Sequence, residues 1–270
     1  MVAFLNLRLS LLNIQAVKLF LKRAPMTAID ILKQSFIFYT RLFNKIFWLS
    51  VASSVIPLFH TAVFSGDQVS VLGTLMIVGV SWFFSVYMMA LIHQFSTEQD
   101  ESLKSALSLT GKKLAPIIMT NLAFGFLVIL VMIPAILIGG VLTSGLNDEV
   151  LKNSIMTVLV AGPVVLAVYH GFLASYFTLV NDLNPVEAIK ASYNQTKNNK
   201  LYFRGILTLF WGFVLYLIVL NLLKLMIALN PFVLGMIEFT FSVFVLPLFT
   251  VFIYRLFVVT KKTDDSDEEL

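Results

Sequence analysis

Long stretches of the chain carry no charged side chain, and they recur along almost its whole length. A bilayer core about 30 Å thick needs roughly 20 apolar residues for a helix to cross it. Six stretches meet this length, and only the last is interrupted by a charge, at Glu238; they are residues 46–66, 68–97, 114–147, 153–181, 205–223 and 225–254. The pattern therefore predicts an all-α integral membrane helical bundle with six transmembrane helices.

Lysine and arginine are sorted between alternate connections of these spans. All but Lys152 and Lys224 lie before residue 46, in 98–113, in 182–204 or after 254, which is 17 of the 19 (19 minus 2). Short cytoplasmic loops are enriched in Lys and Arg relative to loops on the other side. The sorting predicts cytoplasmic N- and C-termini, with three short loops on the opposite face of the membrane.

Composition agrees with a membrane location. Hydrophobic residues make up 59% of the chain and charged residues 13%, whereas a soluble domain is about half apolar and about a quarter charged. There is no cysteine, which excludes disulfides and thiolate metal sites. A net charge of +4 can indicate nucleic-acid binding, but membrane orientation explains where these charges lie. No nucleic-acid partner is expected.

The two ends differ from the six-helix membrane domain, which we place at residues 26–260. Residues 1–25 form a basic extension, because the first acid of the chain is Asp30. Three interpretations stay open for it: an amphipathic segment lying on the membrane, a mitochondrial presequence, or translation from Met26, which would leave the extension outside the native chain. Residues 261–270 form an acidic tail that we expect to be disordered.

Three of the predicted cytoplasmic segments share a pattern of an acid, two residues, a lysine, two residues and a large apolar residue. The sets are Asp30, Leu32, Lys33, Ser35 and Phe36; Glu101, Leu103, Lys104, Ala106 and Leu107; and Glu187, Ile189, Lys190, Ser192 and Tyr193. Two apolar spans follow each set. The protein is therefore predicted to consist of three repeats, each an interfacial amphipathic helix plus a helical hairpin.

Helical periodicity supports these amphipathic segments. In the first, the apolar residues that fall on one face are Ile29, Leu32, Phe36, Tyr39 and Phe43. In the third, the apolar stripe is Val186, Ile189 and Tyr193. Such helices are expected to lie in the interface plane with the apolar side toward lipid. Candidate contacts to lipid or to a partner protein are Lys33, Arg41, Lys104, Lys112, Lys190 and Lys197.

The repeated acid has a structural explanation. Asn184, Pro185 and Glu187 fit the N-cap, the first turn and the third helical position of a capping box. Thr27 and Asp30 fit the same scheme. At Glu101 the match fails, because the cap position there is another acid. We favour capping and solvation for these acids over a role in binding.

At this level of detail the chain resembles the YciC-like family of bacterial inner-membrane proteins. The resemblance covers most of 26–262 and is carried by Met26-Thr27-Ala28-Ile29, by the helix and span from Ala106 to Pro134, by residues 188–198 and by Ile253-Tyr254-Arg255-Leu256. These motifs are diffuse patterns of hydropathy and short helices. The resemblance implies a bacterial inner-membrane location and no established molecular activity. Residues 1–25 and the acidic tail have no counterpart in the family.

No catalytic motif is recognisable along the chain. It lacks a Gly-rich phosphate loop and a metalloprotease motif. The three histidines, His60, His93 and His170, have no second ligand at metal-binding spacing. The sequence therefore predicts a protein that is not an enzyme, with no cofactor and no metal.

Polar residues inside the predicted spans are the remaining candidates, because an ionisable group in a membrane is costly. Lys224 and Glu238 lie six residues before and eight residues after Asn230 at a predicted turn. We expect them to face each other, as an interfacial ion pair in preference to a proton or substrate site. His170, Asn121 and Asn221 are expected to make interhelical hydrogen bonds, typically worth about 1 kcal/mol or less. Four glycines are expected to permit close helix packing: Gly125, Gly162, Gly171 and Gly212.

Two function classes follow. The first, favoured by the interfacial helices, is a non-catalytic envelope protein that interacts with membrane lipids or with other inner-membrane proteins. The second is a small transporter of a neutral or lipid substrate, with its site near Glu238 and His170. The scarcity of charge within the spans argues against ion coupling.

Overall fold

The computed structural model describes residues 27–63, 71–97, 102–226 and 231–267; side chains 56–63, 71–72, 223–226, 231–235, 238, 242 and 262–267 are not described. The described residues form helices and turns, with no strand. The helices are α2 (Ala28–Val63), α3 (Val71–Thr97), α4 (Leu103–Thr143), α5 (Glu149–Gly171), α6 (Ala174–Asn181), α7 (Pro185–Thr196), α8 (Lys200–Met226) and α9 (Pro231–Asp267). The predicted all-α class is confirmed. The basic extension 1–25 lies outside the described residues.

Several of these helices are long and apolar enough to cross a bilayer. Within the described residues the candidate spans are Gly73–Thr97, Leu103–Thr143, Glu149–Asn181, Lys200–Leu222 and Phe239–Lys261. In hydrocarbon a backbone must satisfy its own hydrogen bonds, and a helix does so within one segment. The chain is therefore a helical membrane protein, in agreement with its composition. The first span expected from the sequence falls in the outer part of α2, where many side chains are not described.

The first two amphipathic segments are continuous with the spans that follow them. α2 has 36 residues and α4 has 41, which makes them about 54 and 62 Å long at 1.5 Å per residue. Each is therefore far longer than a bilayer core of about 30 Å. The sequence between Asp30 and Ile46 contains no glycine or proline to end α2, and Pro116 lies within α4 without ending it.

The third amphipathic segment, in contrast, is a separate helix. α7 ends at Thr196, and Asn198 then adopts a left-handed conformation with φ of 62°. The side chain of Asn199 next accepts a hydrogen bond from the backbone N–H of Tyr202 at 3.0 Å, which begins α8. Asparagine tolerates the left-handed region better than most residues. Local turn chemistry therefore separates α7 from its span, and such chemistry is missing from the other two segments.

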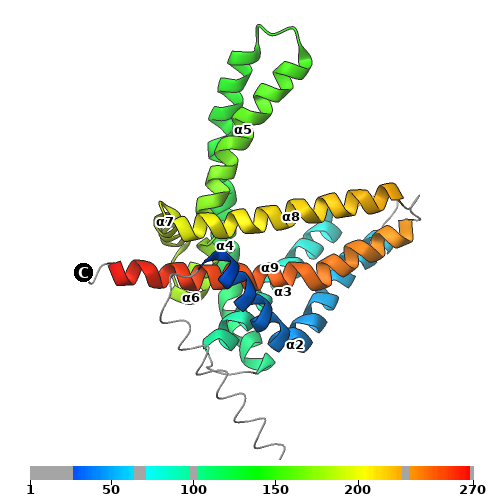
Figure 1. The fold of residues 1–270 in the computed structure, drawn as a ribbon, viewed down its shortest axis with the longest axis vertical. Coiled ribbons are helices and arrows are strands. Elements are labelled where there is room, and N and C mark those ends of the chain that lie inside the picture. The colour runs from blue at the N-terminus through cyan, green and yellow to red at the C-terminus, as the bar shows by residue number, and fades with distance from the viewer. Residues whose placement is uncertain (1–26, 64–70, 98–101, 227–230, 268–270) are drawn as a thin grey trace, which may run out of the picture.

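The helices meet in a packed region that we call the junction. It contains α6 and α7, the first parts of α2, α4 and α8, and the last parts of α3 and α9 (Figure 1). The largest fully buried side chains lie here, among them Ile46, Leu91, Tyr202, Phe252 and Phe257. Most of these positions border the charged segments of the sequence. The main core is therefore at the charged ends of the spans.

A long hairpin leaves the junction. The outer parts of α4 and α5, residues 122–168, project together away from the other helices, and we call them the arm (Figure 1). Many large apolar side chains of the arm are exposed; they include Phe126 at 62%, Leu137 at 65%, Val141 at 74%, Val150 at 76% and Val158 at 71%. The two helices meet through small residues of α4, where Ala135, Gly139 and Thr143 are buried.

The acidic C-terminal segment also differs from the expectation. α9 continues to Asp267, so most of the segment that was predicted to be a disordered tail forms the end of this helix. The side chains beyond Lys261 lie outside those described.

Candidate functional site

Helix α7 packs against α4, α5 and α6 in the junction and begins as the sequence predicts. The Asn184 side chain accepts from the backbone N–H of Glu187 at 3.0 Å, and the Glu187 carboxylate accepts from the N–H of Asn184 at 3.4 Å. Pro185 occupies the first turn. The predicted capping box is therefore confirmed, and the acid at this position satisfies the backbone of its own helix.

The same arrangement begins α2. Thr27 and Asp30 exchange hydrogen bonds, with the N–H of Asp30 donating to the Thr27 hydroxyl at 3.2 Å and the N–H of Thr27 donating to the Asp30 carboxylate at 3.1 Å. The bond from the Thr27 hydroxyl, followed by that from its backbone, lowers the pKa of Asp30. α4 begins instead at Ser102, whose side chain accepts from the N–H of Ser105. The helix of the second repeat is therefore capped by a serine one residue after Glu101, and not by the acid pattern of the other two.

The face of α7 that packs into the protein is small and polar. Ser192, Gln195 and Thr196 are buried there beside Ala188. In the predicted apolar stripe, Val186 is 73% exposed and Tyr193 is 43% exposed. Two of the three stripe residues therefore face outward, whereas Ile189 is half-buried against the core; hydrogen bonds hold the inner face.

His170 lies at the end of α5, where it contacts α7. Its Nδ1 lies 2.8 Å from Oγ1 of Thr196, and Thr196 Oγ1 also lies 2.9 Å from the carbonyl oxygen of Ser192. If the threonine donates to that carbonyl, Nδ1–H of His170 is the donor to Thr196. The imidazole contacts two tyrosine rings, with centroids 4.9 Å away at Tyr169 and 4.8 Å away at Tyr193. This polar residue of the fourth predicted span thus joins two helices through a hydroxyl.

Ser192 explains why the chain breaks between α5 and α6. Its hydroxyl donates to the carbonyl of His170 at 2.5 Å and accepts from the N–H of Leu173 at 3.2 Å. These two backbone groups flank the turn that ends α5. A buried hydroxyl that serves both a donor and an acceptor replaces the partners that a continuous helix would supply. The predicted single span 153–181 is therefore two helices, and a side chain of α7 stabilises the break.

Two further side chains link α7 and α8 to their neighbours. Gln195 donates to the carbonyl of Phe257 at 2.9 Å and to the hydroxyl of Thr260, both on α9. The Tyr202 hydroxyl donates to the carbonyl of Tyr169 at 2.8 Å. Both side chains are buried. Interhelical hydrogen bonds therefore connect α5, α7, α8 and α9 around one point.

A charged pair that the sequence did not single out joins α4 to the end of α6. The ammonium group of Lys113 contacts the carboxylate of Asp182, and the Lys113 side chain is 10% exposed. Asp182 ends α6 in a left-handed conformation. The neighbouring Lys112, which was predicted as a lipid contact, is exposed. Adjacent residues of a helix point about 100° apart, so one of these two lysines faces the protein while the other faces outward. Their shared charge does not show which of them is buried.

The predicted interfacial cations are all on the surface of the described part of the chain. The exposed residues are Lys33, Arg41, Lys104, Lys112, Lys190 and Lys197. Lys197 also lies over the ring of Tyr193, with its ammonium 5.7 Å from the centroid. Their positions are compatible with contacts to lipid headgroups or to a partner.

The predicted intramembrane polar residues have different surroundings. Asn121 accepts from the Ser175 hydroxyl of α6 at 2.6 Å, an interhelical bond as expected. Asn221 donates at 2.8 Å to the carbonyl of Leu217 in its own helix, so the expected interhelical bond is not the one it makes. The expected pair of Lys224 and Glu238 lies outside the described side chains. Gln195 and Lys113 are among the buried polar residues that sequence reasoning did not single out, and Ser192 was named only as a position of the repeat.

An open pocket of about 560 Å³ lies where α5, the α7–α8 turn and α8 meet, and we call it the α8 pocket. Its lining residues are Tyr169, His170, Thr196, Asn198, Asn199, Lys200, Phe203 and Arg204. Lys200 and Arg204 are exposed at its rim. The pocket is therefore lined by two cations together with imidazole, hydroxyl and amide groups and the rings of Tyr169 and Phe203.

A second hollow, of about 380 Å³, lies between α8 and α9 and is almost entirely apolar. Its lining includes Tyr216 and Phe241, whose rings stack with centroids 3.6 Å apart. Among the described residues, this second hollow shares no lining side chain with the α8 pocket. The two hollows are therefore lined by different side chains. No family model, no curated protein and no solved structure matches this chain.

Proposed function

We propose that this chain is a non-catalytic protein of a bacterial inner membrane that works at the lipid interface, in contact with lipids or with other membrane proteins. The proposal includes six spans with both termini in the cytoplasm, and membership of the YciC-like family. The sorting of 17 of 19 Lys and Arg residues to one side supports the orientation. The proposal takes the outer part of α2, a helix of 36 residues, as a sixth span in addition to the five candidates named above.

The observation that carries the proposal is a burial pattern common to the three repeated segments. At the same position of each set, a small side chain is fully buried: Ser35, Ala106 and Ser192, each 0% exposed. The next residue is large, apolar and exposed: Phe36 at 56%, Leu107 at 48% and Tyr193 at 43%. The lysine of each set is exposed as well: Lys33, Lys104 and Lys190. The three segments thus present the same face outward.

This outward face has the chemistry of the membrane interface. An apolar side chain beside a lysine can enter the boundary between headgroups and acyl chains while the ammonium stays with the phosphates. In water, three such exposed apolar groups would have no favourable partner. The repetition supports a shared role in lipid or partner contact, and it supports the threefold repeat expected from the sequence.

The proposal can be tested with the lipids that the protein retains in native-lipid discs. We expect anionic lipid to be enriched around the wild-type chain. The charge reversal Lys33→Glu/Lys104→Glu/Lys190→Glu should remove most of this enrichment, because each basic residue near an anionic surface contributes roughly 1 kcal/mol. Lys152→Glu, which reverses an exposed charge on the arm, should leave it unchanged. Mass spectrometry of the discs measures both the lipids and any co-purified membrane protein.

Two results would count against the proposal. Lipid composition equal to the bulk membrane, with no recurrent partner protein, would remove its basis. Equal loss in the Lys152→Glu control would show that total charge, and not the repeated face, determines the enrichment.

A further inference from the structure

The α8 pocket differs from the repeated surfaces in that its two cations, Lys200 and Arg204, line a cavity. Lys200 and Arg204 are four residues apart on α8, so their side chains leave the same face of the helix. The salt bridge found among the described residues is that of Lys113 with Asp182, so neither cation has a carboxylate partner there. Two cations without a carboxylate partner among the described residues, both lining one cavity, favour an anionic ligand.

We propose that the α8 pocket binds a single phosphate group, held by Lys200 and Arg204. The inference rests on the proposed function, because it assigns one defined ligand to a protein that works at the lipid interface. Arginine presents a planar fork of donors that matches phosphate oxygens, and lysine adds a compact point charge. The two residue types together suit a phosphate better than a neutral polar group.

The remaining wall of the pocket combines polar groups with the rings of Tyr169 and Phe203, and contacts within the protein hold two of its polar side chains. His170 is held by Thr196 at 2.8 Å and lies between two tyrosine rings. The side chain of Asn199 caps α8. These contacts hold the side chains of His170 and Asn199 in place before any ligand binds. A volume of about 560 Å³ also leaves room for the group to which a phosphate is esterified.

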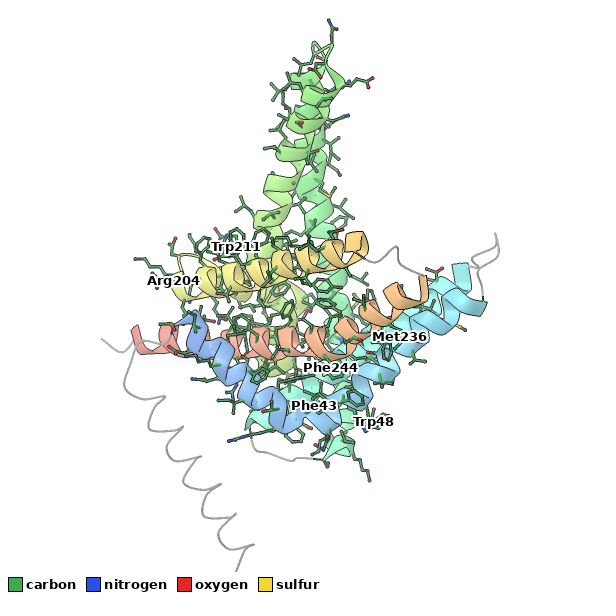
Figure 2. The ribbon with its side chains drawn as sticks, turned by 45° about the vertical axis from the view of Figure 1, so that its right-hand side comes forward. Phe43, Trp48, Arg204, Trp211, Met236 and Phe244 are labelled. Atoms are coloured by element: carbon green, nitrogen blue, oxygen red, sulfur yellow. The ribbon has the colours of Figure 1, made fainter. Side chains whose placement is uncertain are left out.

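The surface beyond the pocket favours a lipid as the source of the phosphate. Arg204 is the last charge before an uncharged stretch that begins at residue 205, so the pocket lies where headgroups meet the hydrocarbon. Exposed apolar side chains continue along α8 from the pocket: Phe203 at 57%, Leu207 at 41%, Phe210 at 56% and Trp211 at 61%. Figure 2 shows Arg204 at the beginning of α8 and Trp211 farther along the same helix.

This apolar strip has the direction that an acyl chain would need. From Arg204 to Trp211 the helix rises about 10 Å, and that distance leads from the pocket into the hydrocarbon core. A lipid phosphate in the pocket would therefore have its chains beside Phe203, Leu207 and Trp211. Free phosphate would use the two cations but not the strip.

The test compares ligands and variants of the full chain in detergent micelles. Native mass spectrometry would follow binding of dioleoyl phosphatidylglycerol, of dioleoyl phosphatidylcholine and of inorganic phosphate. We expect the wild type to retain one phosphatidylglycerol molecule. Lys200→Gln/Arg204→Gln should weaken this binding roughly 30-fold, from about 1 kcal/mol for each cation. Lys200→Arg/Arg204→Lys, which keeps both charges, should bind within a few-fold of the wild type, and this variant controls for folding.

A control removes a charge outside the pocket. Lys152→Gln changes an exposed lysine of α5 and should leave the single tight copy in place. Inorganic phosphate that binds the wild type as tightly as phosphatidylglycerol, and is lost in Lys200→Gln/Arg204→Gln, would support the same site with a soluble source.

Other results would contradict the proposal that the α8 pocket binds a phosphate group. Unchanged phosphatidylglycerol binding in Lys200→Gln/Arg204→Gln would do so, and so would an equal loss in the Lys152→Gln control. Equal retention of phosphatidylcholine, unaffected by the variants, would show that the acyl chains alone are recognised. These failures leave the proposed function standing wherever the discs still show enrichment that depends on Lys33, Lys104 and Lys190.

Discussion

The junction and the arm are built from similarly apolar helices, yet large apolar side chains are buried in the junction and exposed in the arm. In the junction, Leu256, Phe252 and Tyr202 are fully buried. In the arm, side chains of the same kind point outward, with Leu137 65% exposed and Val158 71% exposed. The hydrogen bonds differ too. Those of Ser192 connect different helices, whereas the Ser154 hydroxyl donates to Val150 of its own helix.

The difference shows which forces hold each region together. In lipid there is no hydrophobic gain from bringing two apolar helices together, so association depends on close packing and interhelical hydrogen bonds. The junction has both kinds of contact. The arm has a seam of small residues, and its outer surface is left to lipid or to another protein. The following substitutions test this contrast with matched pairs, one member in each region.

The largest expected effect comes from a cavity in the junction. Leu256→Ala removes a fully buried side chain and should lower the free energy of unfolding by about 2–5 kcal/mol. Leu137→Ala, in the arm, should change it by no more than about 0.5 kcal/mol. Unfolding in mixed micelles with increasing dodecyl sulfate would measure both. Equal losses would contradict the view that the arm is held mainly by its small-residue seam.

A second pair adds volume instead of removing it. A side chain at Gly205 would meet Leu256, with a Cβ placed 2.7 Å from one of its methyl carbons, whereas a Cβ at Gly140 would have no atom within 4 Å. Gly205→Val should therefore destabilise by about 1–3 kcal/mol, and Gly140→Val should be nearly neutral. The midpoint of thermal unfolding in detergent provides the comparison. A destabilised Gly140→Val variant would point to a partner covering that face of α4.

The third pair concerns hydroxyl groups. Ser192→Ala leaves the buried N–H of Leu173 without its acceptor, and an unsatisfied buried donor costs about 1–3 kcal/mol. Ser154→Ala removes an exposed bond within α5 and should have little effect. Hydrogen exchange should become faster at residues 171–175 in Ser192→Ala. Unchanged exchange there would mean that the break between α5 and α6 does not depend on α7.

The smallest effect is expected at the exposed end of α2. Thr27→Val removes the hydroxyl that bonds to Asp30, so the first turn should exchange its amide protons faster while the junction is unaffected. Because the folded state lowers the pKa of Asp30 below 3.8, this contribution is present above that value and is lost as the pH falls through the lowered pKa. The protection of the amide protons in this turn should therefore decrease as the pH falls through the lowered pKa of Asp30 in the wild type. The decrease should be much smaller in Thr27→Val. A response spread over the whole molecule would contradict a local cap.

The sequence predicted some contacts correctly because they are local. The capping box of Asn184 and Glu187 and the pair of Thr27 and Asp30 join residues three apart, so their geometry follows from the helix itself. The glycines were a harder case. Gly171 lies against the ring of Phe124, whereas Gly125 and Gly162 have nothing within 4 Å of an added Cβ. The expected close packing is therefore found at the first and not at the other two, because a glycine does not encode its neighbour.

By itself the sequence determined the class of this protein: apolar runs of membrane length, a sorted set of basic residues and three repeated amphipathic segments. Only the tertiary structure decided which faces of those segments pack. Ser35, Ala106 and Ser192 turn inward, and Lys113 is buried beside an exposed Lys112. The physical reason is that lipid and protein interior are equally apolar. Hydrophobic periodicity therefore does not show which side of a membrane helix meets its neighbour, and shape and hydrogen bonding select it.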